Sequence, residues 1–203
     1  MVLYRNRERF SNLSIKIGIV FSKAGLSPNH WTMLVILPAF ASVYFLLEKQ
    51  FLAAAAFLLL SAFLDFVDGS VARVMGKVTK FGAYLDTVMD RYVEAIILVG
   101  LLFVNLPGFY FPAYVWIFIF FFGSFMTTYA KSAAKEKELT EKEITGGLLE
   151  RGERLIILFV GILLAYFRLS YLTYIIVMLA VLTNMTALQR IKIAADSARR
   201  TAQ

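Results

Sequence analysis

Six segments of this 203-residue chain are long and apolar enough to approach a transmembrane helix, which needs about 20 mostly apolar residues. Polar joints, some containing glycine or proline, separate the segments. An even number of spans returns the chain to the side on which it starts. The sequence therefore predicts an all-α integral membrane protein whose six transmembrane helices cover roughly residues 31–47, 51–73, 82–105, 109–133, 153–168 and 171–190.

The segments before and after this six-helix core, 31–190, differ from it in composition. Residues 1–24 mix apolar side chains with five Lys and Arg residues, which predicts a juxtamembrane amphipathic helix that lies in the membrane interface. The next helix starts near Pro28, with Asn29 as a possible cap. Residues 191–203 are expected to form a C-terminal tail. We expect residues 1–203 to form a single membrane domain.

The distribution of the 21 Lys and Arg residues predicts the orientation. Only Lys49 and Arg168 fall in the loops after the first and fifth spans, and none follows the third, so the other 19 flank the opposite side. By the positive-inside rule, this opposite side and both termini are cytoplasmic, as expected for a multi-pass protein of the cell membrane. The formal charge of +7 suits membrane lipids with anionic head groups and phosphorylated substrates. The apolar neighbours of the basic residues argue against nucleic acid as a partner.

Four aspartates, Asp65, Asp68, Asp86 and Asp90, lie in segments otherwise suited to cross a membrane. Each carboxylate in hydrocarbon costs roughly 3 kcal/mol, so four of them need a compensating partner. Asp65 and Asp68 share one helical face, Asp86 and Asp90 share a face of the next helix, and a short turn joins the two. An antiparallel pair of helices can therefore bring all four together. The chain has no Cys and one His, so oxygen ligands suited to Mg²⁺ or Mn²⁺ would hold the metal.

The aspartates could also serve in ion pairs or in transport. The acids could pair with Arg73, Arg91 or Lys80 as structural salt bridges, although four acids exceed what such pairing needs. A cation channel, a proton-coupled transporter or a divalent metal transporter also places carboxylates in a membrane. Glu94 extends the second stripe by one turn, and we expect it to bind a water or Arg91.

The aspartates are part of a longer pattern. Residues 65–90 match D-x2-D-G-x2-A-R-x8-G-x3-D-x3-D at every fixed position. In this pattern the chain resembles the CDP-alcohol phosphotransferase family, and the six-span layout extends the resemblance over nearly the whole chain. The resemblance implies transfer of a phosphatidyl-type group from a CDP-linked lipid donor to an alcohol, with release of CMP. It also implies a homodimer.

The same resemblance implies roles for individual residues. Asp65, Asp68, Asp86 and Asp90 would bind two divalent ions, Mg²⁺ or Mn²⁺, and Asp90 would also act as the catalytic general base on the acceptor hydroxyl. The CDP-linked donor would be bound by Pro28, Asn29, Thr32, Asp65, Gly69, Ala72, Arg73, Thr79 and Gly82. The small residues in this set allow close approach of a ligand, and a guanidinium suits phosphate.

Sequence outside the signature indicates the acceptor. Arg91, Lys131 and a G-G-x2-E-R-x-E-R stretch at residues 146–154 are similar to phosphatidylinositol-phosphate and archaetidylinositol-phosphate synthases. This resemblance implies CDP-diacylglycerol or CDP-archaeol as the donor and a myo-inositol phosphate as the acceptor, its phosphate bound by Lys131, Arg151 and Arg190. From the residues alone, these three cytoplasmic-side cations suit a dianion, or they merely obey the positive-inside rule. Glycerol 3-phosphate as the acceptor and CDP-inositol as the donor stay open.

Overall fold

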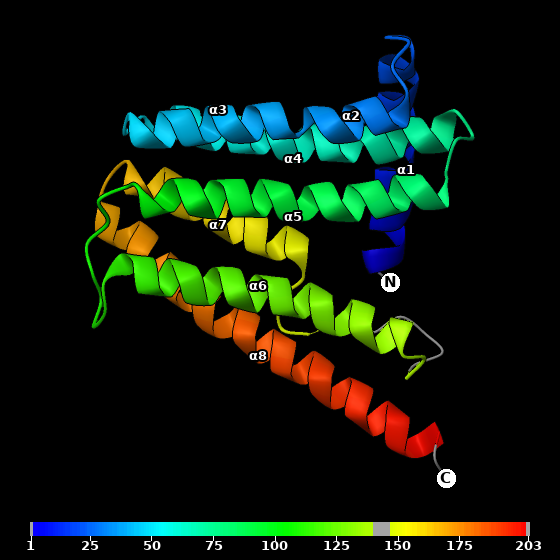
Figure 1. Cartoon of the computed structure of the whole chain (residues 1–203). Helices are drawn as coiled ribbons and strands as arrows, with labels where there is room; N and C mark the ends of the chain where they lie inside the picture. Colours follow the sequence, from blue (N-terminus) through cyan, green and yellow to red (C-terminus); the bar gives the residue numbers. More distant parts are fainter. Residues whose placement is uncertain (1, 140–146, 202–203) are drawn as a thin grey trace. The chain divides into compact units, whose positions relative to one another are not determined.

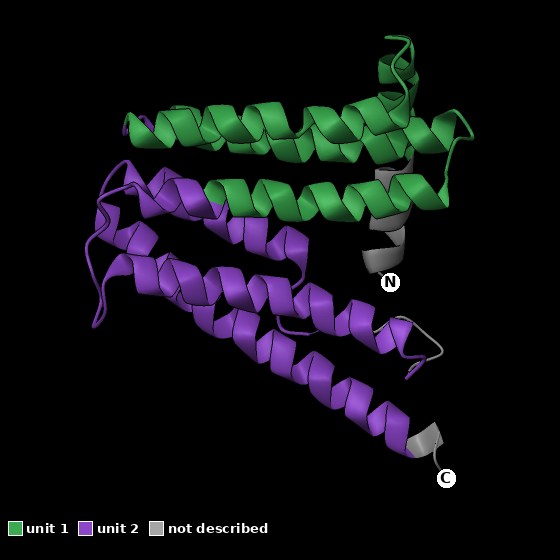
Figure 2. Cartoon of the chain, viewed as in Figure 1, with its two compact units in different colours: residues 1–48, 53–97 green, residues 49–52, 98–203 purple. Residues whose placement is uncertain are grey.

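The computed structural model describes the backbone of residues 2–139 and 147–201 and the side chains of residues 12–139 and 147–199. Within these residues the regular structure is helical, apart from an isolated bridge between Phe109 and Phe111. The helices are α1 (Val2–Ser22), α2 (Pro28–Leu34), α3 (Ile36–Leu47), α4 (Phe51–Val74), α5 (Lys80–Leu102), α6 (Ala113–Glu136), α7 (Arg151–Ala165) and α8 (Leu169–Thr201) (Figure 1). Figure 2 shows two compact units: unit 1 comprises residues 1–48 and 53–97, and unit 2 comprises residues 49–52 and 98–203.

Four helical stretches in the described part of the chain are long and apolar enough to cross a membrane. They are Pro28–Leu47, Phe51–Val74, Ala113–Glu136 and Leu169–Arg199. These stretches correspond to four of the six predicted spans, and the prediction of an all-helical chain with membrane-capable helices is confirmed. The other two segments form α5, which carries the second pair of motif aspartates, and α7, which has 15 residues. The count of six spans therefore stays a prediction.

The first apolar stretch is interrupted at Val35, between α2 and α3. Pro38 has no N–H to donate to the carbonyl of Leu34, which weakens the helix at this point. The Ser61 hydroxyl of α4 donates to the carbonyl of Val35 at 2.8 Å. The serine thus provides a hydrogen bond to a backbone carbonyl that no water would reach in a membrane. The same bond connects α4 to the α2–α3 pair.

α4 ends in a tight turn that reverses the chain. Gly76 has a φ of +62°, a conformation that is easy for glycine. The N–H of Lys77 donates to the Ala72 carbonyl at 2.9 Å, and the N–H of Gly76 donates to the Arg73 carbonyl at 3.3 Å. These are the two bonds of a Schellman motif. α5 then runs back beside α4 (Figure 1), which is the antiparallel arrangement that the two aspartate stripes predict.

α1 occupies the N-terminal segment and crosses the other helices of unit 1 (Figure 1). Its side chains Ile17 and Phe21 pack against a buried cluster of Trp31, Val67 and Val71. One face of α1 is therefore covered by α2 and α4. Its position in a membrane interface stays a prediction.

In unit 2, α6 and α7 both pack against α8. Glycines permit close approach: a Cβ at Gly161 of α7 would lie 3.0 Å from the Cγ2 atom of Ile175. Gly123 of α6 faces Asn184, whose Nδ2 atom donates to the carbonyl of Ile119 at 2.9 Å. Small residues and an amide hydrogen bond between α6 and α8 thus hold these helices together, as is common in membranes.

Two boundaries in unit 2 differ from the predicted ones. Residues 109–112 form a turn, and α6 begins at Ala113, immediately after Pro112 at the N-cap position. α8 continues to Thr201, so most of the segment predicted as a C-terminal tail is helical. The chain contains no Gly or Pro after residue 168, so nothing local ends the helix.

Candidate active site

Three of the four predicted metal ligands meet in unit 1. Asp65 and Asp68 lie on α4, and Asp86 lies on the antiparallel α5. One carboxylate oxygen from each lies within 4.8 Å of the other two. The turn at Gly76 makes this possible, because it places the last turns of α4 beside the first turns of α5.

This cluster fits a divalent cation. Asp68 is 5% exposed, and its Oδ2 atom is buried without a hydrogen-bond partner. A buried carboxylate oxygen in this state is unfavourable without a compensating charge, and neighbouring carboxylates repel one another. Oxygen donors of this kind suit Mg²⁺ or Mn²⁺. Asp90, the fourth predicted ligand, lies one turn beyond Asp86 on α5 and outside this group of three.

A pocket of about 320 Å³ lies beside the cluster and shares Asp68 and Asp86 with it. Eight of the nine residues predicted to bind the CDP-linked donor line this pocket: Pro28, Asn29, Thr32, Gly69, Ala72, Arg73, Thr79 and Gly82. Asp65, the ninth, belongs to the acidic cluster instead. The wall also contains Lys77, Val78 and Ala83, which the motif leaves unspecified. Their only signal in the sequence is their position between the two pairs of aspartates.

Asn29 lines the pocket because another residue caps α2. Ser27 is the N-cap: its hydroxyl accepts from the N–H of His30, and its own N–H donates to the His30 ring. Pro28 occupies the first helical turn, where its missing N–H costs nothing. The prediction that Asn29 caps the helix is therefore wrong. The Oδ1 atom of Asn29 instead lies near Gly82, where a Cβ would be 3.4 Å away.

Thr79 both lines the pocket and starts α5. Its Oγ1 atom accepts a hydrogen bond of 2.9 Å from the N–H of Gly82, as an N-cap residue does. Thr32 also bonds within its own helix, because its hydroxyl donates to the Pro28 carbonyl at 3.1 Å. A hydroxyl both donates and accepts, so Thr79 can still donate its proton to a ligand.

The guanidinium of Arg73 is held by two serines that the motif does not include. Its Nη2 atom donates to the Oγ of Ser14 on α1 at 2.8 Å and to the Oγ of Ser70 on α4 at 3.4 Å. It lies over Gly69, where a Cβ would be 3.4 Å from the Nη1 atom. The only sequence signal for Ser14 is a hydroxyl on an amphipathic helix, which is too common to identify a site.

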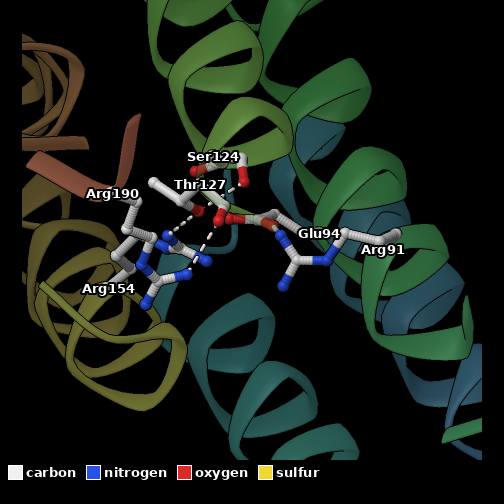
Figure 3. A network of polar contacts seen from close by, with 6 residues as sticks. All are labelled: Arg91, Glu94, Ser124, Thr127, Arg154 and Arg190. Atoms are coloured by element: carbon white, nitrogen blue, oxygen red, sulfur yellow. Dashed lines mark hydrogen bonds and ion pairs between the residues drawn. The ribbon is translucent and has the colours of Figure 1, made fainter. Parts of the chain in front are cut away.

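Thr127 of α6 joins the three helices of unit 2. Arg154 of α7 is 2% exposed, and its Nη1 atom donates to the Oγ1 of Thr127 at 2.8 Å. Arg190 of α8 donates through Nη1 to the carbonyl oxygen of the same residue at 2.8 Å. Figure 3 shows both guanidinium groups directed towards Thr127. Neither Thr127 nor Arg154 belongs to the predicted site residues.

The three residues predicted to bind the acceptor's phosphate all lie within one helical turn of these contacts. Arg190 makes one of them itself. Lys131 follows Thr127 by four residues on α6, and Arg151 precedes Arg154 by three residues on α7. Residues at these spacings share a helical face. Arg190 therefore takes part in this contact itself, whereas Lys131 and Arg151 each share a helical face with a residue that does.

Two acidic side chains have structural partners. Glu94 forms an ion pair with Arg91 one turn earlier on α5 in unit 1 (Figure 3), and Arg91 is one of the two partners expected for it. Glu153 accepts a hydrogen bond of 2.8 Å from the N–H of Glu150 and completes a capping box at the start of α7. These carboxylates stabilise the helices that carry the predicted site residues.

The family model described as CDP-alcohol phosphatidyltransferase matches residues 26–186. The chain belongs to this family. The resemblance carried by the aspartate signature is thus confirmed, and the protein is a transferase. Among curated relatives of this phosphatidyltransferase, the archaetidylinositol phosphate synthase of Pyrococcus horikoshii is 34% identical over 179 residues, which cover 87% of each chain.

Two crystal structures of the Mycobacterium tuberculosis phosphatidylinositol phosphate synthase share the fold of this phosphatidyltransferase. The structure with CDP-DAG bound is 26% identical with a TM-score of 0.78, and the match covers 90% of this chain and 94% of that chain. The structure in complex with manganese and citrate is 28% identical with a TM-score of 0.79, covering 90% and 88%.

Proposed function

We propose that this phosphatidyltransferase moves a phosphatidyl-type group from CDP-diacylglycerol or CDP-archaeol to a hydroxyl of a myo-inositol phosphate and releases CMP. The observation that carries the proposal is the pocket of unit 1, which is lined by eight of the predicted donor-binding residues and shares Asp68 and Asp86 with the acidic cluster. The names of the similar proteins support the choice of substrates, since one is an archaetidylinositol phosphate synthase and another was crystallised with CDP-DAG.

The pocket would bind the nucleotide end of the donor. Arg73 offers a planar cation whose fork of N–H groups matches phosphate oxygens. Gly69 and Gly82 expose backbone, so a nucleotide can approach closely. Thr79 would donate its hydroxyl proton to the ligand. The remaining donor-binding residues in this proposal are Pro28, Asn29, Thr32, Asp65 and Ala72.

Asp65, Asp68, Asp86 and Asp90 would hold two divalent ions, Mg²⁺ or Mn²⁺. When bound, such metal supplies positive charge at the diphosphate and at the oxygen that leaves with CMP. The acidic cluster and the manganese in the similar crystal structure support this part of the proposal.

Asp90 would act as the general base. In the reaction, the acceptor hydroxyl oxygen bonds to the phosphorus of the phosphatidyl group, and the bond from that phosphorus to the CMP oxygen breaks. The hydroxyl proton passes to the Asp90 carboxylate, since a hydroxyl is a weak nucleophile until its proton is taken. The position of Asp90 one turn beyond Asp86, outside the group of three, supports this second role in addition to its role as a metal ligand.

Lys131, Arg151 and Arg190 would bind the phosphate of the acceptor. A dianion needs several cations or N–H donors, and arginine provides bidentate contacts. The hydrogen bond of Arg190 to the Thr127 carbonyl supports the assignment, and so does the one-turn spacing of Lys131 from Thr127 and of Arg151 from Arg154. Inositol phosphate is soluble, so its binding residues should be reached from water.

In the membrane, the chain would form one domain that crosses the bilayer six times and pairs as a homodimer. α1 would lie in the interface, and both termini and the active site would face the cytoplasm. The four apolar helices and the one-sided distribution of Lys and Arg support this arrangement.

Release of CMP by the purified protein tests the proposal. CDP-diacylglycerol, CDP-archaeol and CDP-inositol are each supplied with Mg²⁺ and with myo-inositol phosphate, glycerol 3-phosphate or inositol. We expect rapid release only when a CDP-lipid and inositol phosphate are both present. Consumption of glycerol phosphate with inositol phosphate ignored would show that the acceptor is wrong. If no pair of substrates releases CMP, the transferase function fails and metal transport becomes the next function to test.

Variants of two basic residues test the acceptor site in the same assay. Arg151→Ala should raise the KM for inositol phosphate much more than the KM for the donor. Lys137→Ala is the matched control, because Lys137 is exposed and pairs with Glu136 at the end of α6. Equal effects of Arg151→Ala on both substrates would argue against its role at the acceptor.

A further inference from the structure

One buried hydroxyl connects α1 to the wall of the donor pocket. Ser14 is 7% exposed, and its Oγ lies 2.8 Å from the Oγ of Ser70 and 2.8 Å from the Nη2 of Arg73. Arg73 lines the pocket, whereas Ser14 is not among the residues of its wall. Ser14 therefore contacts the pocket's arginine without facing the ligand space itself.

Counting protons assigns the donors and acceptors in this contact. A serine hydroxyl has one proton to donate, and Ser70 donates its proton to the carbonyl of Phe66 at 2.8 Å. The Ser14 hydroxyl must then donate to the Oγ of Ser70, since Ser70 has no second proton. This leaves an oxygen lone pair of Ser14 to accept from Arg73. The hydrogen bonds thus run in one direction, from Arg73 through Ser14 and Ser70 to the backbone of α4.

Close packing of α1 on α4 fixes the position of Ser14. Gly18 lies one turn after Ser14 on the same face of α1. A Cβ at Gly18 would lie 2.5 Å from the carbonyl oxygen of Ser70 and 2.6 Å from the Cγ2 of Val74, so only glycine permits this approach. The helix backbone that carries Ser14 is therefore held directly against the turn of α4 that precedes Arg73.

An arginine that is held in place is a better phosphate ligand than one that moves freely. A long side chain loses rotamer freedom when it binds, and a side chain already ordered loses less. The hydrogen bonds to Ser14 and Ser70 both start from the Nη2 group and leave the N–H groups of Nη1 for a ligand. Ser14 therefore orders the Arg73 side chain without occupying the pocket in which a ligand would bind.

We propose that Ser14 is a positioning residue of the donor site, which holds the Arg73 guanidinium in the orientation that binds a phosphate of the CDP-linked donor. This inference rests on the proposed function, because that function makes the ligand of the pocket a CDP-linked lipid. It gives α1 a role in substrate binding in addition to its predicted place at the membrane surface.

A double-mutant cycle tests the inference. The variants are Ser14→Ala, Arg73→Ala and the combination of both, with Ser22→Ala as the matched control. Ser22 lies two turns further along α1, and its hydroxyl bonds the carbonyl of Ile19 within the same helix. The measurements are the Kd of CDP-diacylglycerol for the protein in nanodiscs with Mg²⁺, the KM for each substrate, and the apparent Tm.

We expect Ser14→Ala to weaken donor binding by about tenfold, because Arg73 loses its nearest acceptor. The KM for the acceptor should stay within about twofold of the wild-type value, as should every parameter of Ser22→Ala, since neither change touches the cations of unit 2. In the Arg73→Ala background, Ser14→Ala should cause no further loss of donor affinity. A residue that only docks α1 would instead lower the donor affinity of both backgrounds equally.

Unchanged donor affinity in Ser14→Ala would overturn the inference, and so would an additive loss in the double variant. Failure of the proposed function gives a different result. If the wild-type protein releases CMP while Ser14→Ala binds the donor normally, only the role of Ser14 is lost. If the wild-type protein neither binds CDP-diacylglycerol nor releases CMP, the proposed function is lost together with the inference.

Discussion

The Nη1 atom of Arg154 donates a hydrogen bond of 2.8 Å to the hydroxyl of Thr127, and both side chains are buried. A buried guanidinium is unfavourable unless its N–H groups are hydrogen-bonded. The carbonyl of Thr127 also accepts from Arg190, so one residue of α6 orders a cation from each of α7 and α8. We therefore expect the packing of α6 against α7 and α8 to depend on Thr127.

Thr127→Val tests this relationship, because valine keeps the shape of threonine and removes the hydroxyl. We expect a loss of about 2 kcal/mol in the free energy of unfolding, since a buried charged donor loses the hydroxyl that accepts from its Nη1 atom. The apparent Tm in detergent should fall by about 4 to 8 °C for a chain of this size. Thr127→Ser retains the hydroxyl and serves as the control. Identical melting of the two variants would show that the hydrogen bond contributes nothing.

Asp68→Asn should impair metal binding, because it removes one charge from the cluster with almost no change in size. Titration with Mn²⁺ followed by electron paramagnetic resonance should show an affinity lower by roughly 10- to 100-fold. Asp196→Asn is the control, since Asp196 is exposed on α8. Wild-type Mn²⁺ affinity in Asp68→Asn would remove this residue from the metal site.

Treatment of the wild-type protein with a chelator should abolish CMP release and leave the helix content unchanged.

Asp90→Asn should reduce turnover by about 10² to 10⁴-fold, the usual contribution of a general base. The variant should still bind CDP-diacylglycerol and should melt close to the wild-type temperature, because asparagine has nearly the size of aspartate and the group of three aspartates remains to hold metal. The measurements are CMP release at saturating substrates and the donor Kd. Wild-type turnover with metal present would show that another group removes the proton.

Two variants of Thr79 separate its two roles. Thr79→Ala should cost about 1 kcal/mol of stability through loss of the N-cap, whereas Thr79→Asn keeps a good cap and removes only the hydroxyl. If Thr79 also donates to the nucleotide, the KM for the donor should rise severalfold in both variants, and the apparent Tm should fall only in Thr79→Ala. A wild-type donor KM in Thr79→Asn would leave Thr79 with the capping role alone.

Much of the pocket of unit 1 was predictable because its residues are encoded over short distances along the chain. The spacing of the aspartates fixes which face of each helix they share, and Gly76 marks the turn that brings the two faces together. Eight of the nine residues predicted to bind the donor line one pocket for the same reason. One local prediction is wrong: Asn29 does not cap α2, because Ser27 occupies the N-cap position.

The sequence by itself determined the family, the helical character of the chain and the acidic motif, since each depends on local pattern and composition. Only the tertiary structure decided the contacts of Arg73 with Ser14 and of Thr127 with Arg154 and Arg190. These contacts join residues on different helices, so they depend on how the helices pack. Helical periodicity states which face a residue occupies, but it does not state which distant helix will cover that face.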